Sequence, residues 1–102
     1  MDGPWCCIGD FNAILHQSEK QSRHSPSYKQ MEEFQVALEL CHLYDLGFQG
    51  YKFTWNNKRP RAANTRERLD RAMANREWKE KFSASTLTHG FSHEFDHVPI
   101  FL

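Results

Sequence analysis

Long apolar runs are absent from this sequence, and their absence excludes a membrane-spanning helix. No stretch of the 102 residues approaches the roughly 18 to 20 consecutive apolar positions that a span requires. The first four residues, Met-Asp-Gly-Pro, also lack the basic and then apolar pattern of a secretory signal peptide. We therefore expect an intracellular protein without membrane contact.

Cysteine is scarce, and its spacing fits neither a disulfide framework nor a zinc site. The chain has three cysteines, Cys6, Cys7 and Cys41, of which the first two are adjacent and none belongs to a Cys-x-x-Cys pair. We expect all three to be buried free thiols in a reducing compartment.

No excess of charge marks the chain as a nucleic-acid-binding protein. It has 13 basic and 13 acidic residues, and its 39% hydrophobic and 25% charged content is that of an ordinary globular domain. The distribution is uneven, because residues 58–71 hold two acidic residues against six basic ones: Lys58, Arg59, Arg61, Arg66, Arg68 and Arg71. Considered alone, this basic segment favours a solvated loop over a binding groove.

Apolar periodicity in the first half predicts a buried strand, a loop and one long helix. Residues 5–8 are a short apolar run that ends at a glycine, as in a buried strand, and residues 16–27 are polar, as in a connecting loop. Residues 28–43 follow as an amphipathic helix, which Ser27 is placed to cap. Its apolar stripe consists of Met31, Phe34, Leu38 and Cys41.

The second half predicts short strands and one short helix. Asn75 is suited to cap a helix that carries Trp78 and Phe82 on one face. Residues 67–73 fit a strand or a helical turn equally well. Strands are expected at residues 51–55, 83–88 and 98–102. The pattern as a whole predicts a chain that mixes short strands with two helices.

Four short motifs suggest chemistry, and their order matters more than any one of them, because each alone has low specificity. They are Gly-Asp-Phe-Asn at residues 9–12, Phe-Thr-Trp at 53–55, Arg-Leu-Asp at 68–70 and Asp-His-Val-Pro-Ile at 96–100, with Leu-Gly-Phe at 46–48 between the first two. In this order, over nearly the whole chain, they resemble the second half of the endonuclease/exonuclease/phosphatase family. The sequences of these motifs resemble most those of endonucleases of plant LINE-type (non-LTR) retrotransposons.

The resemblance implies a fold and an incomplete domain. The family fold is a four-layer α/β sandwich, the DNase I-like fold, and residues 1–102 correspond to its C-terminal half. No segment corresponds to the N-terminal half, which carries the glutamate that binds the metal most directly. We therefore expect a sheet face without its partner, with exposed apolar surface, poor solubility and little activity of the chain alone.

The resemblance also implies a reaction, the hydrolysis of DNA phosphodiesters with Mg²⁺ or Mn²⁺, which nicks DNA to prime reverse transcription. Asp10 would orient or deprotonate the attacking water, and Asn12 would bond the phosphate. His97, oriented by Asp70, would lie at the scissile phosphate, either as general base or as a charged stabiliser. Asp96 would be a metal ligand, because a hard cation takes carboxylate oxygens and waters. These groups suit a transition state that spreads negative charge over phosphate oxygens.

Partners and location follow from the same resemblance. DNA would be the substrate, and its contacts would be Trp55, Lys58, Arg59, Arg61 and Arg68. The absent N-terminal half-domain and a reverse transcriptase region would be further partners, and a working retroelement endonuclease would act in the nucleus.

Each candidate residue also has a structural interpretation. Asp10 and Asn12 would form an Asx turn after a strand, Asp70 a surface ion pair with a neighbouring arginine, and Trp55 part of the core. Phe95 stands where the family has serine and would misplace the neighbouring metal carboxylate or fill a gap. The alternative function is a catalytically inactive remnant with weak nucleic-acid binding, which the missing glutamate favours.

A remote alternative is a zinc metalloprotease, because His93, Glu94 and His97 match the pattern His-Glu-x-x-His. In that pattern two histidines one helical turn apart bind zinc and the glutamate activates water, which requires a continuous helix. Gly90 precedes the segment and Pro99 follows it, and both oppose a helix here.

Overall fold

The centre of the fold is a three-stranded antiparallel sheet built around one buried strand. A computed structural model describes residues 3–92 and 95–102. In this sheet β7 (Asp70–Ala74) lies between β1 (Cys6–Asp10) and β3 (Tyr44–Asp45). All five residues of β7 are buried, so this strand fixes the positions of its neighbours.

Two smaller sheets extend the arrangement, and each has three strands of two residues. In the second sheet the central strand pairs antiparallel with both neighbours; the order is β2 (Lys20–Gln21), β6 (Arg66–Glu67) and β5 (Trp55–Asn56). In the third sheet the central strand pairs parallel with the first and antiparallel with the last; the order is β4 (Gln49–Gly50), β8 (Thr88–His89) and β9 (Ile100–Phe101).

The long predicted helix is present as α1 (Tyr28–Leu40), and it is capped as expected. The hydroxyl of Ser27 accepts a hydrogen bond from the backbone amide of Gln30. The helix ends earlier than the predicted residue 43, because His42 takes a left-handed φ of 54° and the amide of Leu43 donates back into the last turn. The short helix α2 (Arg76–Lys81) is also confirmed, with the predicted asparagine cap.

The predicted strands prove shorter than the sequence pattern suggested. Of residues 51–55, only Trp55 belongs to a strand, because the backbone of Thr54 makes single hydrogen bonds to two different segments instead of a continuous ladder. Of residues 83–88, only Thr88 is in a strand. The expected loop over residues 16–27 contains β2 and a 3₁₀ turn, η1 (Gln17–Glu19). The undecided segment 67–73 is extended, as parts of β6 and β7.

Part of the predicted burial is wrong. The three cysteines are free, but Cys6 and Cys7 are half-buried and Cys41 is exposed at the end of α1. Ile8, in the expected buried strand, is 44% exposed, so the face of β1 that carries its side chain is not covered. On α1 only Met31 of the predicted stripe is fully buried.

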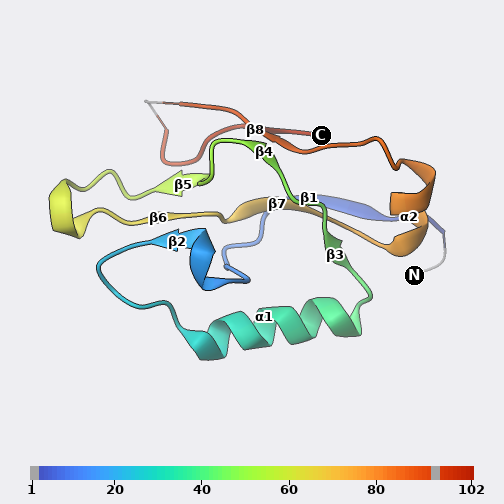
Figure 1. The fold of residues 1–102 in the computed structure, drawn as a ribbon, viewed down its shortest axis with the longest axis horizontal. Helices are drawn as coiled ribbons and strands as arrows, with labels where there is room; N and C mark the ends of the chain where they lie inside the picture. Colours follow the sequence, from blue (N-terminus) through green and yellow to red (C-terminus); the bar gives the residue numbers. More distant parts are fainter. Residues whose placement is uncertain (1–2, 93–94) are drawn as a thin grey trace.

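The core connects α1 to the central strands. Ile14, Met31 and Leu69 form a buried cluster, and Trp55 packs against it. Figure 1 shows α1 along one side of β1 and β7, with β4 and β8 on the opposite side. The strands that carry the chemically interesting side chains therefore lie in the middle of the molecule.

The molecule is flat and exposes many apolar side chains. Its principal extents are 46 × 30 × 16 Å, and its radius of gyration of 14.4 Å exceeds the roughly 13 Å usual for 100 residues. Exposed large apolar side chains occur on the β1-β7-β3 and β4-β8-β9 sheets, on α1 and in the connecting segments of the described part, from Trp5 to Leu102. No helix in residues 3–92 and 95–102 has the length and apolar content needed to cross a membrane.

Candidate active site

Two carboxylates face each other at one end of the central sheet. Asp10 is the last residue of β1, Asp70 is the first of β7, and the two are partners in the antiparallel register. The side chain of Asp10 is 44% exposed, whereas that of Asp70 is 12% exposed. Like charges directly opposite each other on adjacent strands lower stability. Such a local conflict is typical of a functional site.

A histidine completes this group. His97 forms an isolated β-bridge with Trp55, which brings its ring to the two aspartates. The distance from His97 Nδ1 to Asp70 Oδ2 is 2.7 Å, and the distance from His97 Nε2 to Asp10 Oδ2 is 3.8 Å. With Asp70 ionised, Nδ1 is the donor, so in the neutral ring the proton is on Nδ1 and Nε2 carries a free lone pair.

One buried threonine positions both Asp70 and His97. The hydroxyl oxygen of Thr54 accepts hydrogen bonds from the amides of Leu69 at 2.9 Å and Asp70 at 3.0 Å. Its carbonyl accepts a bond of 2.8 Å from the amide of Val98. Thr54 is fully buried, so these bonds are shielded from water. Its place between two aromatic residues in the sequence gave no sign of this role.

The loop after β1 carries Asn12 beside this group. The amide of Asn12 donates to Asp10 Oδ1 at 2.7 Å, and Asn12 has a φ of 51°. The predicted Asx turn is therefore confirmed. It uses one carboxylate oxygen of Asp10, while the other faces His97, so the turn and a chemical role for Asp10 are compatible.

The donor set fits a hydrated divalent cation. Asp10, Asp70 and His97 each offer one ligand atom, and these atoms lie within 4.8 Å of one another. Two carboxylates beside one imidazole are a set of groups that attracts a cation. Asp10 fits this role better than Asp70, because Asp70 Oδ2 is bonded to His97 and Asp70 is less exposed. Mg²⁺ keeps several waters and needs only one or two carboxylates.

Asp96, the predicted metal ligand, is not part of this group. It is exposed, and its backbone carbonyl accepts a hydrogen bond of 2.9 Å from the amide of Asn56. The set of mutually close ligand atoms found in the described residues does not include its carboxylate. Phe95, beside it, is 66% exposed.

Three of the predicted DNA contacts lie on one exposed loop that begins at the candidate active site. Lys58, Arg59 and Arg61 are exposed in the segment that follows β5 and includes a short 3₁₀ turn, η2 (Arg61–Ala63). Trp55 precedes this loop and pairs with His97, but it also packs against the core, so its structural interpretation applies as well.

The fifth predicted DNA contact, Arg68, is wrong, because this side chain is buried. Arg68 is only 5% exposed and belongs to a buried ionic cluster with Arg71, Glu19 and Asp45. Its two terminal nitrogens each lie 2.8 Å from an oxygen of Asp45. A guanidinium held in this way is not available to a phosphate. The suggested surface ion pair between Asp70 and a neighbouring arginine is equally wrong, because Arg71 faces the cluster and Asp70 bonds His97.

The buried ionic cluster also holds the loop that carries Asn12. Arg71 donates to the carbonyl of Ala13 at 3.1 Å, and the amide of Leu15 donates to Glu19. Burial alone raises the pKa of Glu19, but the hydrogen bond and charge of Arg71 outweigh it and hold that pKa below its ordinary value. The same opposition, with Arg68 as the main partner, lowers the pKa of Asp45.

Another histidine, His89, is buried and has a structural role. His89 is 4% exposed and stacks on Phe48, with ring centroids 4.3 Å apart. Its Nδ1 donates to the carbonyl of Tyr51, and its Nε2 is buried with no hydrogen-bond partner among the described residues. Burial lowers the pKa of His89 and so favours the neutral form of the ring.

In the described residues, no helix is found at the segment that matches the metalloprotease pattern. His93 and Glu94 lie outside the described residues, and residues 95–97 form a bend and a β-bridge.

Comparison with family models, with curated proteins and with solved structures found no match.

Proposed function

We propose that this chain carries the reactive group of a metal-assisted phosphodiester hydrolase, of the DNA-nicking kind that retroelements encode, on part of a DNase I-like sandwich. The observation that supports this most strongly is the order Asp70, His97, Asp10, with separations of 2.7 and 3.8 Å. A carboxylate behind an imidazole, with a second carboxylate beyond it, suits the activation of a water molecule.

In this proposal His97 is the general base. Asp70 accepts the Nδ1 proton and keeps the ring in the tautomer whose Nε2 is free. The distance of 3.8 Å between Nε2 and Asp10 Oδ2 is longer than a direct hydrogen bond, so both atoms can bond to the same water. That water forms the new bond to phosphorus and gives its proton to Nε2. The P–O ester bond breaks, and the departing oxygen takes up a proton from solvent water.

Two further groups act on the phosphate. Asn12 is exposed and lies beside Asp10, and its side-chain amide donates to a phosphate oxygen. A divalent cation, Mg²⁺ or Mn²⁺, held by the carboxylate of Asp10, would neutralise the negative charge that develops on the phosphate. Asp96 has no ligand role in this proposal, because its carboxylate is not part of the described group.

The exposed loop gives the substrate its contact surface. Lys58, Arg59 and Arg61 lie on a segment that starts next to His97 and can reach phosphates on either side of the cleaved bond. Phosphate contacts of this kind fix the register of a protein on DNA without reading its sequence.

Nicking of supercoiled plasmid by the full chain tests the proposal. We expect nicking that requires Mg²⁺ or Mn²⁺, is abolished by chelation, and is lost in His97→Ala and Asp10→Asn. His24→Ala, a change at an exposed histidine elsewhere, and Asp96→Asn should retain it. Absence of metal-dependent nicking, or equal nicking by the wild type and His97→Ala, would instead support an inactive remnant that only binds nucleic acid.

A further inference from the structure

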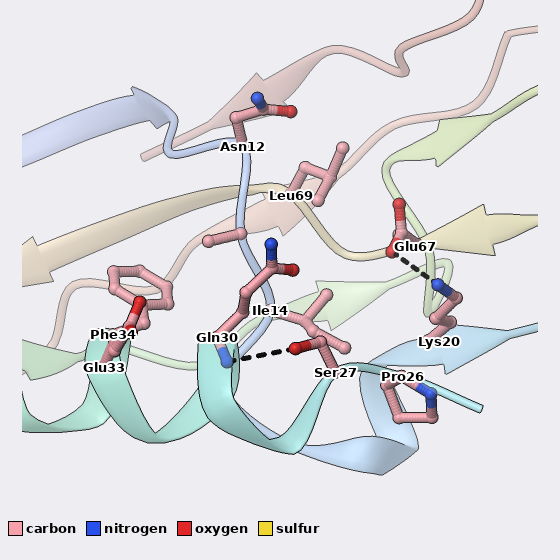
Figure 2. Close-up of a pocket in the computed structure, with 11 residues that line it drawn as sticks. Asn12, Ile14, Lys20, Pro26, Ser27, Gln30, Glu33, Phe34, Glu67 and Leu69 are labelled. Carbon is pink, nitrogen blue, oxygen red and sulfur yellow. Dashed lines mark hydrogen bonds and ion pairs between the residues drawn. The ribbon is translucent and has the colours of Figure 1, made fainter.

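A cavity of about 620 Å³ opens on the other side of the loop that carries Asn12. Its volume is within the range of small-molecule sites. Figure 2 shows that its walls come from the loop after β1, from β2, from the first turns of α1 and from the segment of β6 and Leu69. None of the reactive residues Asp10, Asp70 and His97 lines it.

The cavity combines an apolar floor with hydrogen-bonding walls. Ile14 and Leu69, 9% and 6% exposed, form the floor, and the aromatic ring of Phe34 lies at one end. The side-chain amide of Gln30 supplies donors and an acceptor at the wall, and Asn12 borders the cavity with its own amide directed away from Gln30. A flat ligand with an apolar face and a polar edge matches this lining.

The charges of the lining disfavour a phosphate. Glu33 and Glu67 contribute two negative charges. Lys20 is the single cation among the described residues that line the cavity, and its ammonium lies 3.6 Å from Glu67. The carboxylate of Glu33 therefore favours a ligand that donates hydrogen bonds, such as the amino group of a nucleobase.

The cavity is linked to the candidate active site through two neighbouring residues. Asn12 lines it and bonds Asp10 through its backbone amide, and Leu69 lines it next to Asp70 in the chain. A ligand in the cavity is therefore directly beside the group that we propose to act on the phosphate.

We infer that this cavity holds one unstacked nucleobase of the cleaved strand, and that it selects bases with an exocyclic amino group over thymine. The inference rests on the proposed function for its substrate class. Glu33 accepts from the amino group, the side-chain amide of Gln30 bonds the ring nitrogens, and Phe34 contacts the base plane. The site adds sequence preference to a surface whose other contacts are made to phosphates.

Binding of free nucleosides tests the inference without any cleavage step. Deoxyadenosine, deoxycytidine and thymidine are titrated into the full chain and followed by NMR, which detects weak binding, with inorganic phosphate as a further probe. We expect deoxyadenosine and deoxycytidine to bind at least about fivefold more tightly than thymidine, the smallest discrimination typical of a specific contact to a base. Glu33→Gln should remove this difference.

Glu32→Gln is the matched control, because Glu32 is an exposed neighbour on α1 that does not line the cavity. Equal binding of thymidine, equal behaviour of the two variants, or phosphate binding that Glu33→Gln alters would overturn the inference. Nucleoside selectivity in a chain that does not nick DNA would reject the proposed function and leave the base site standing. Metal-dependent nicking without nucleoside selectivity would reject the base site and leave the proposed function standing.

Discussion

Replacing Arg71 by methionine should remove a large part of the stability of this protein. Arg71 has no exposed surface, and it donates to Glu19 at 2.9 Å, to Asp45 at 3.0 Å and to the carbonyls of Ala13 and Arg68. With its two arginines and two acids the buried cluster is neutral, and the substitution leaves it with one uncompensated negative charge. Breaking a buried ion pair in this way costs about 3–5 kcal/mol.

That cost is large beside the whole free energy of unfolding, which is about 5–15 kcal/mol for typical domains. Arg76→Met provides the matched control. Arg76 also pairs with an acid, Glu80, at 3.1 Å, but its side chain is 84% exposed and the pair spans one helical turn. Removal of such an exposed pair changes stability by only about 0.3–0.5 kcal/mol.

Urea unfolding at neutral pH, followed by circular dichroism, measures both variants against the wild type. A third variant, Arg71→Met with Glu19→Gln, removes the orphaned charge and leaves the Arg68–Asp45 pair intact. It should recover part of the loss, because coupled residues are not additive. A loss in Arg71→Met of less than about 1 kcal/mol, or no recovery in the double variant, contradicts the buried-charge explanation.

Three other predictions test the remaining parts of the structure. Thr54→Val leaves two buried amides without their acceptor, so it should lower nicking by at least tenfold and unfolding stability by about 1–3 kcal/mol, whereas Thr54→Ser should retain both. Because burial lowers the pKa of His89, the unfolded chain takes up the proton first, and stability should fall as the pH drops below about 6.5; His89→Gln should flatten urea midpoints between pH 7 and 5. Acid unfolding at lower pH, through Glu19, should persist in that variant, since a carboxyl with a lowered pKa loses its contribution only as the pH falls through the folded value. Lys58→Ala with Arg59→Ala should weaken DNA binding and reduce the slope of log K against log salt by about 0.9 for each lost phosphate contact, and an unchanged slope would remove the loop from the binding surface.

The sequence predicted those features that depend on local chemistry. Ser27 and Asn75 cap helices in the structure because capping needs only a side-chain oxygen and a free amide two or three residues ahead. The Asx turn at Asp10 is local in the same sense. The proximity of Asp70 and His97, which the family resemblance implied, is also found, although their chemical roles remain a proposal.

Features that depend on pairing between distant segments could not be predicted. The sequence pattern predicted Arg68 and Arg71 as part of an exposed basic segment. Their acidic partners, Glu19 and Asp45, lie 49 and 23 residues from Arg68, so no local pattern indicates the pairing. The one available signal was the position of Arg71, which is followed in β7 by the small or apolar residues Ala72, Met73 and Ala74. The two-residue strands were overestimated for a related reason, because alternation does not reveal where a partner strand ends.

The strand β7 explains why stability and the candidate chemistry are coupled. Successive side chains of a strand point to opposite faces, so Asp70 reaches His97 while Arg71 reaches the buried ionic cluster. Arg71 then bonds the carbonyl of Ala13, the residue after Asn12. The cluster therefore holds the loop that separates the reactive group from the nucleobase cavity. A substitution that loosens the cluster without unfolding the chain should consequently impair nucleoside selectivity and nicking together, although no residue of the cluster is a member of the reactive group.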